Sequence, residues 1–194
     1  MACRCALAIT VVITCAVALT PNAHADVTDD RRALVMLRVL AYDKQLSQRV
    51  GDEVRVVVAY TADDAGAAEG TRWSTAFARA GKLKVNGRPV VVIAYRVESY
   101  EQLGRALDHS AAVMACDGLT RKLSPGALAK LTRAKHVLSI STREADVAAG
   151  LAVAIVPGKQ RDEIVVNLRA AQAEGVKFDA GLLQLAREVK EVSP

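Results

Sequence analysis

The chain has 194 residues, of which 52% are hydrophobic and only 4% aromatic. This length can bury one sizeable core, and the aliphatic composition favours an α/β or α fold over an aromatic-rich β-sandwich. The net charge of +5 comes without a long Lys/Arg run or interleaved aromatic residues, which argues against nucleic-acid binding.

The N-terminal residues 1–25 have the three parts of a secretory signal peptide. Arg4 forms a short positive region, Ala6 to Leu19 an apolar stretch too short to span a bilayer comfortably, and Ala23-His24-Ala25 a small-x-small cleavage site. Cleavage after Ala25 would leave a mature domain of residues 26–194 and remove one positive charge. Lipidation at Cys15 is the alternative, but the residue before this cysteine does not fit a lipoprotein signal well.

Only one cysteine, Cys116, remains after such cleavage, so the mature chain cannot form an intramolecular disulfide. Cys116 ends an apolar run and is expected to be a small buried hydrophobic residue at the end of a strand. A catalytic thiol would need basic surroundings that lower its pKa, and the sequence around it shows none.

The first expected element is a helix over residues 28–46, where Thr28 and the acidic residues after it favour the helix start. Residues 54–60 form a run of β-branched residues, typical of a strand that is buried on both faces in a parallel sheet. Residues 61–70 are small and acidic and are expected to be a flexible loop. A second helix is expected over residues 71–81.

Further buried strands are expected at residues 90–95, 111–116, 137–140, 151–156 and 163–168. Helices are expected at residues 100–109, from Pro125, after Arg143, at 169–174 and at the C-terminus, where Phe178, Leu182, Leu185, Ala186 and Val189 would share one face. Asp117-Gly118 is expected to be a turn.

The loop between the last two strands is too short for a helical crossover, so these two strands should be antiparallel. The pattern predicts a single-domain three-layer α/β sandwich, with a mainly parallel sheet and an antiparallel C-terminal strand pair.

No catalytic, metal or nucleotide motif occurs after residue 25, so no catalytic residue, metal ligand or cofactor is expected. His109 and His136 each lie near a predicted helix end, where a cation or a hydrogen-bonding ring is favoured. Open α/β sheets bind ligands at the carboxyl ends of their strands. The residues there that could form a ligand pocket are Asp63, Glu98, Asp117, Thr142 and Arg143, although strand ends are polar in any α/β protein.

The helix over residues 71–81 is a candidate for partner contact, because it carries Arg72, Trp73 and Phe77. Trp and Arg are the residue types that most often anchor interfaces. The alternative is that Trp73 and Phe77, one helical turn apart, simply pack in the core.

Three segments together resemble the YfiR family of exported bacterial proteins. The first is LAYDKQL (residues 40–46) followed by Arg49 and Gly51, and the second is VAAGLAV (residues 147–153). The third is IVVNLRAAQAEG (residues 164–175) followed by Phe178 and LLQLA (residues 182–186). No single segment is diagnostic, but their combination covers essentially the whole mature chain.

The resemblance implies a periplasmic α/β protein without enzymatic activity that binds the extracytoplasmic part of a membrane-anchored signalling protein. Family members inhibit a diguanylate cyclase in this way, which controls cyclic di-GMP signalling and biofilm formation, and an outer-membrane lipoprotein can sequester them. A histidine kinase or an outer-membrane receptor is another partner that the resemblance leaves open, as is a homodimer. The alternative reading is a periplasmic small-ligand binding protein or receptor module that uses the strand-end pocket.

Overall fold

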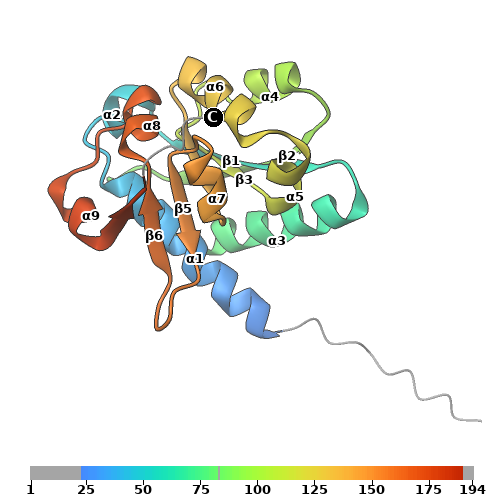
Figure 1. Cartoon of the computed structure of the whole chain (residues 1–194), viewed down its shortest axis with the longest axis horizontal. Coiled ribbons are helices and arrows are strands. Elements are labelled where there is room, and N and C mark those ends of the chain that lie inside the picture. The colour runs from blue at the N-terminus through green and yellow to red at the C-terminus, as the bar shows by residue number, and fades with distance from the viewer. Residues whose placement is uncertain (1–22, 83, 190–194) are drawn as a thin grey trace, which may run out of the picture.

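The computed structural model describes residues 23–82 and 84–189. Its centre is a seven-stranded sheet in the order β2-β1-β3-β4-β5-β6-β7 (Figure 1). The strands are β1 (Val54–Thr61), β2 (Val90–Val97), β3 (Ala112–Ala115), β4 (Leu138–Ser141), β5 (Val153–Val156), β6 (Glu163–Val166) and β7 (Ala186–Glu188). Neighbouring strands run parallel except β5 and β6, which pair antiparallel as predicted.

Helices cover both faces of this sheet, so the predicted three-layer arrangement is confirmed. They are α1 (Ala23–Ala41), α2 (Leu46–Arg49), α3 (Asp64–Ala80), α4 (Tyr100–Ala106), α5 (Asp117–Lys122), α6 (Pro125–Lys135), α7 (Glu144–Ala148), α8 (Leu168–Ala173) and α9 (Ala180–Leu185). Residues of α1, α3 and α8 belong to the core on one face, and residues of α4, α5 and α6 to the core on the other.

Strand β1 is buried on both faces, as its run of β-branched residues predicts. Val56 and Val58 face the core under α1 and α3, whereas Val57 and Ala59 face the core under α4, α5 and α6. All four side chains are fully buried. The strand lies between β2 and β3, one position in from the edge of the sheet.

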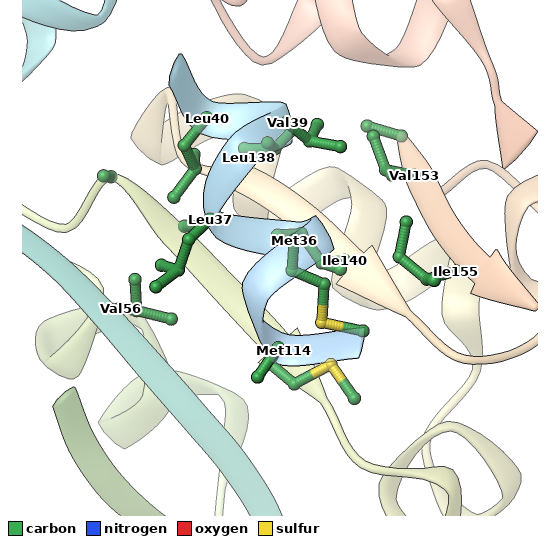
Figure 2. Close-up of a cluster of buried hydrophobic side chains, with 14 of the residues drawn as sticks. Met36, Leu37, Val39, Leu40, Val56, Met114, Leu138, Ile140, Val153 and Ile155 are labelled. Carbon is green, nitrogen blue, oxygen red and sulfur yellow. The ribbon is translucent and has the colours of Figure 1, made fainter. Parts of the chain in front are cut away.

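The larger core lies between α1 and the sheet (Figure 2). Four apolar residues of one helix face, Met36, Leu37, Val39 and Leu40, pack over side chains of four different strands. The strand residues are Val56, Met114, Leu138, Ile140, Val153 and Ile155. Helix α1 therefore spans the middle of the sheet and connects the N-terminal strands to the C-terminal ones.

Helix α3 begins at Asp64, so the prediction of a flexible loop over residues 61–70 is wrong. The Asp63 carboxylate accepts a hydrogen bond from the Gly66 N–H (2.8 Å) and caps the helix. A Cβ atom on Gly66 would overlap Thr61, and one on Gly70 would overlap the ring of Tyr60. These glycines are typical of loops in a sequence, but here they allow a helix to lie close against β1.

Two further boundaries differ from the prediction because contacts between distant segments decide them. Asp117 begins helix α5 instead of a turn, since the Glu69 carboxylate accepts hydrogen bonds from the N–H groups of Asp117 (2.8 Å) and Gly118 (3.1 Å). The last helix ends at Leu185, and the chain continues as β7, which pairs with β6. Pairing at the sheet edge thus prevails over the helical periodicity of the C-terminal residues.

The predicted first helix is also interrupted after Ala41, where the chain turns into α2. Asp43 in this turn is buried and accepts hydrogen bonds from the N–H groups of Gln45 (2.9 Å) and Lys177 (3.0 Å). It also pairs with Arg49 at 2.6 Å. The Lys177 hydrogen bond fastens the segment before α9 to the end of α1, and the ion pair ties α2 to the same turn.

A second buried acid, Glu174, lies at the C-terminus of α8 and is fully buried. Its carboxylate accepts hydrogen bonds from the Thr132 hydroxyl (2.6 Å), the Ser139 hydroxyl (2.6 Å) and the Ser139 N–H (2.9 Å). Burial raises the pKa of Glu174 to about 7, although these hydrogen bonds oppose the shift. The residue connects α8 to α6 and to the start of β4.

We expect Val57→Asp to abolish the soluble folded protein. An unpaired buried carboxylate costs several kcal/mol, against a total stability of about 5–15 kcal/mol. Ala94→Asp is the matched control, because Ala94 lies on the neighbouring strand but is exposed. Soluble yield and circular dichroism measure the outcome, and a folded Val57→Asp variant would contradict the burial of β1.

We expect the wild-type protein to lose stability as the pH rises and Glu174 ionises, and we expect Glu174→Gln to abolish this loss. Because the folded-state pKa is raised from 4.5 to about 7, this group favours the folded state below pH 4.5 and loses that contribution as the pH rises to about 7. The loss amounts to about 3 kcal/mol. Chemical denaturation between pH 4.5 and 8 measures it, and parallel stability profiles for the wild type and the variant would show that Glu174 does not titrate in this range.

Candidate functional site

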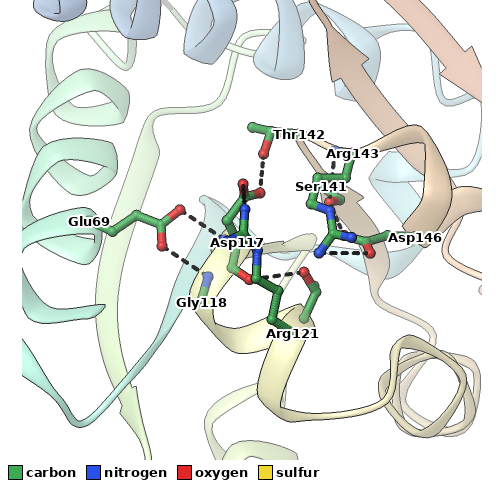
Figure 3. A network of polar contacts seen from close by, with 9 residues as sticks. Glu69, Asp117, Gly118, Arg121, Ser141, Thr142, Arg143 and Asp146 are labelled. Atoms are coloured by element: carbon green, nitrogen blue, oxygen red, sulfur yellow. Dashed lines mark hydrogen bonds and ion pairs between the residues drawn. The ribbon is translucent and has the colours of Figure 1, made fainter. Parts of the chain in front are cut away.

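The strand-end residues predicted to form a pocket are only partly brought together. Asp63 and Asp117 line one hollow of about 380 Å³ beside α3 and α5. Thr142 contacts Asp117, because its hydroxyl donates a hydrogen bond of 2.6 Å to the Asp117 carboxylate (Figure 3). Glu98 and Arg143 do not line this hollow.

The polar groups at these strand ends are paired with one another. Asp117 also contacts Arg121 at 3.5 Å, and Arg143 contacts Asp146 at 3.8 Å (Figure 3). Asp63 pairs with Lys122, and this pairing, together with the Gly66 N–H, lowers the pKa of Asp63 to about 2.

Glu98 pairs with Arg96 at 2.7 Å, and Asp146 accepts a hydrogen bond of 2.6 Å from the Ser141 hydroxyl. A ligand at the strand ends would have to displace one of these existing partners.

The partner-contact residues predicted on α3 need correction, because Trp73 and Phe77 are 1% and 0% exposed. Their rings pack against each other at 6.2 Å in the core beneath α1. Arg72 is partly exposed and pairs with Asp29 of α1 at 2.7 Å. The two aromatic side chains therefore hold α3 to the rest of the fold and offer no surface to a partner.

Cys116 is fully buried, as predicted. Burial raises the pKa of its thiol, and the nearby Glu69 carboxylate raises it further, so the thiol stays protonated and unreactive. His109 and His136 follow α4 and α6 in the left-handed conformation, near helix ends as predicted. Among residues 23–82 and 84–189, no group of three or more His, Cys, Asp or Glu side chains could hold a metal ion.

A second hollow, of about 370 Å³, lies between α1, the start of β6 and α9, and we call it the α1–α9 groove. It is lined by Arg31, Val35, Arg38, Val39, Tyr42, Arg161, Asp162, Glu163, Ile164, Leu182 and Leu185. Leu185 is 52% exposed, an unusual position for a large apolar side chain on the last helix. Leu183 on the same helix is 42% exposed but does not line the groove.

The charged residues that line the groove are three arginines, Arg31, Arg38 and Arg161, and two acids, Asp162 and Glu163. Asp162 is nearly buried and pairs with Arg31 at 2.9 Å and with Arg32 at 3.2 Å. Arg38 and Arg161 are exposed and contact no acidic group in the described part of the chain. The groove thus combines an apolar floor with two unpaired guanidinium groups.

Sequence reasoning missed this groove because its walls come from opposite ends of the chain. Asp162 lies 131 positions from Arg31, and α9 follows α1 by more than half the chain. Leu185 was expected to face inward with the rest of a longer helix. The early end of α9 leaves it at the surface instead.

Solved structures show the same arrangement of the fold. The chain is similar to an ABC domain in complex with L-Trp from Streptococcus pneumonia, with a TM-score of 0.59 and 13% identity over 81% of this chain and 60% of that one. It is similar to a conserved domain protein from Vibrio cholerae, with a TM-score of 0.59 and 12% identity over 84% and 60% of the two chains. At such identities the likeness concerns the fold alone.

A third similar structure is CD0873 from Clostridium difficile, a substrate binding protein with adhesive properties in its ligand-free, open form. It matches with a TM-score of 0.55 and 12% identity, over 77% of this chain and 58% of that one. The chain thus spans about 60% of the length of these solved structures.

A comparison with curated proteins finds no match. None of the helices in the described residues is long and apolar enough to cross a membrane. A family model does match, from residue 66 to residue 187, which includes α3, the sheet from β2 onward and the C-terminal helices. The chain belongs to the family described as YfiR/HmsC-like.

Proposed function

We propose that this protein is a periplasmic, non-enzymatic regulator that binds the extracytoplasmic part of a membrane signalling protein. Membership of the YfiR/HmsC-like family carries this proposal. Residues 1–25 act as the signal peptide, and residues 26–194 form the single mature domain. The first described residues of α1, Ala23 to Ala25, include the cleavage site, whereas residues 1–22 lie outside the described part.

The partner that the family suggests first is a diguanylate cyclase, which the regulator inhibits. A histidine kinase in its place, and an outer-membrane lipoprotein that sequesters the regulator, fit the same reading. Some members of the family carry cysteine pairs that respond to oxidation. Such control does not fit this chain, because its one mature cysteine, Cys116, is buried.

The α1–α9 groove is the surface through which we infer that the partner binds. Large apolar side chains that are exposed beside a preformed groove are typical of interaction sites. Leu185 supplies such a side chain, and the floor formed by Val35 and Ile164 would receive an apolar side chain of the partner.

The alternative, a small-ligand receptor that uses the strand ends, has less support. The carboxylates and guanidinium groups there are already engaged with each other, as for Asp117 with Thr142 and Arg121. Breaking such contacts costs free energy that a ligand would have to restore.

Export has a direct test. The apolar stretch and the small-x-small motif predict cleavage after Ala25, so the first residue of the exported protein should be Asp26. N-terminal sequencing of the periplasmic fraction measures this. A product that keeps Met1, or one lipidated at Cys15, contradicts the proposal.

The regulatory function is tested in cells by deleting the gene and restoring it with variants. Deletion should raise cellular cyclic di-GMP, and the wild-type gene should lower it again. Leu185→Glu should fail to restore the low level, because placing a carboxylate in an apolar contact weakens the partner's binding about tenfold or more.

Leu183→Glu is the matched control, since it changes the other large exposed leucine of α9, which lies outside the groove. Both variants should melt at the wild-type temperature. Unchanged cyclic di-GMP after deletion would refute the cyclase reading, whereas full activity of Leu185→Glu would refute only the proposed surface.

A further inference from the structure

The α1–α9 groove has the composition of a small-molecule site as well as of a docking surface. Its volume of about 370 Å³ lies in the range of ligand pockets, which are about 300–1,000 Å³. Val35, Ile164 and Leu185 are at least partly exposed and give it an apolar lining, whereas Val39 and Leu182 border it but are fully buried. From these residues and from the charges at the rim, we propose that the groove binds a small amphipathic acid, with an aliphatic chain and one carboxylate.

The charges at the rim select an anion. Arg38 on α1 and Arg161 before β6 line the groove from different elements, and each guanidinium group can donate hydrogen bonds to a carboxylate bound in the groove. Of the acidic residues at the rim, Asp162 is paired with two arginines, whereas Glu163 has a contact of 3.7 Å with Arg187, which also pairs with Glu144 at 2.7 Å. An anionic head group therefore gains two charged contacts, and a cationic one would be repelled.

The apolar chain of the acid would contact the aliphatic residues that line the groove near these arginines. Arg38 follows Val35 by three positions, and Arg161 precedes Ile164 by three positions. On helix α1 this spacing places Arg38 and Val35 on the same face, whereas Arg161 and Ile164 line the groove from the segment that enters β6. Tyr42 also lines the groove, and its hydroxyl contacts no polar group of the described residues, so it is available to the head group as a donor.

The walls of the groove are fixed before any ligand binds. The pairs of Asp162 with Arg31 and Arg32 hold the β5–β6 turn against α1. The Asp179 N–H donates to the Tyr42 carbonyl at 3.0 Å and holds the start of α9 against the end of α1. A preformed site loses little conformational entropy on binding, which favours a small ligand with few contacts.

This site has a regulatory consequence that rests on the proposed function. The acid and the membrane partner would occupy the same groove and exclude each other. An amphipathic acid in the periplasm would then release the partner from inhibition. Binding of the acid itself does not depend on the identity of that partner.

The test is a calorimetric titration of the mature protein with three probes that share a chain and differ in head group: octanoate, 1-octanol and octylamine. Octanoate should bind, 1-octanol more weakly, and octylamine not at all. Arg38→Gln and Arg161→Gln should each weaken octanoate binding about tenfold, as expected for the loss of one charged hydrogen bond.

Lys130→Gln is the matched control, because it removes an exposed cation of α6 on the opposite face of the sheet and should leave octanoate affinity unchanged. Both arginines are exposed, so their variants should melt as the wild type does. Absent octanoate binding, equal binding of octylamine, or unchanged affinity in both arginine variants would overturn the proposal. None of these outcomes bears on cyclic di-GMP after gene deletion, so the two proposals fail separately.

Discussion

The buried ion pair between Asp43 and Arg49 is the contact on which the shape of the molecule depends most. Arg49 also donates hydrogen bonds to the carbonyls of Ala111 (3.3 Å) and His136 (2.9 Å), which precede β3 and β4. Asp43 holds Lys177 before α9. Removing one member would leave a buried charge unpaired, at a cost of about 3–5 kcal/mol. The pair therefore determines how α1, the sheet and α9 lie relative to each other, and with them the groove.

The segments that resemble the YfiR family contain buried polar residues of this kind. Asn167 caps α8 by accepting from the Ala170 N–H, and its amide donates to the Val147 carbonyl. Glu174 binds the start of β4, and the glycine after it takes a positive φ of 76°. Each of these residues satisfies a particular set of backbone groups, which explains why the pattern indicates the fold more directly than the function.

Apolar runs predict the positions of the strands well, and burial on both faces follows from the run in β1. The run at residues 90–95 was also expected to be buried, but β2 lies at the edge of the sheet, is mostly half-buried and exposes Ala94. The prediction for β1 ends one residue early, and the antiparallel β5–β6 pair follows from its short loop. Helices α3 and α5 could not be predicted in full, since Gly70 against Tyr60 and Glu69 against Asp117 are contacts between segments distant in the chain. The groove could not be predicted for the same reason, because its charged residues come together only where the β5–β6 turn packs against α1.

The strand ends beside α5 and the α1–α9 groove differ in what they can offer a binding partner. At the strand ends, a charged group such as Asp117 already has its hydrogen bonds and ion pairs, so binding there exchanges one set of contacts for another and gains little. At the groove, Arg38 and Arg161 are hydrated rather than paired, and Leu185 exposes apolar area to water. A partner that supplies an anion and an apolar side chain gains free energy from both, because each contact is new. The distribution of unpaired groups therefore supports the proposal that a partner binds between α1 and α9.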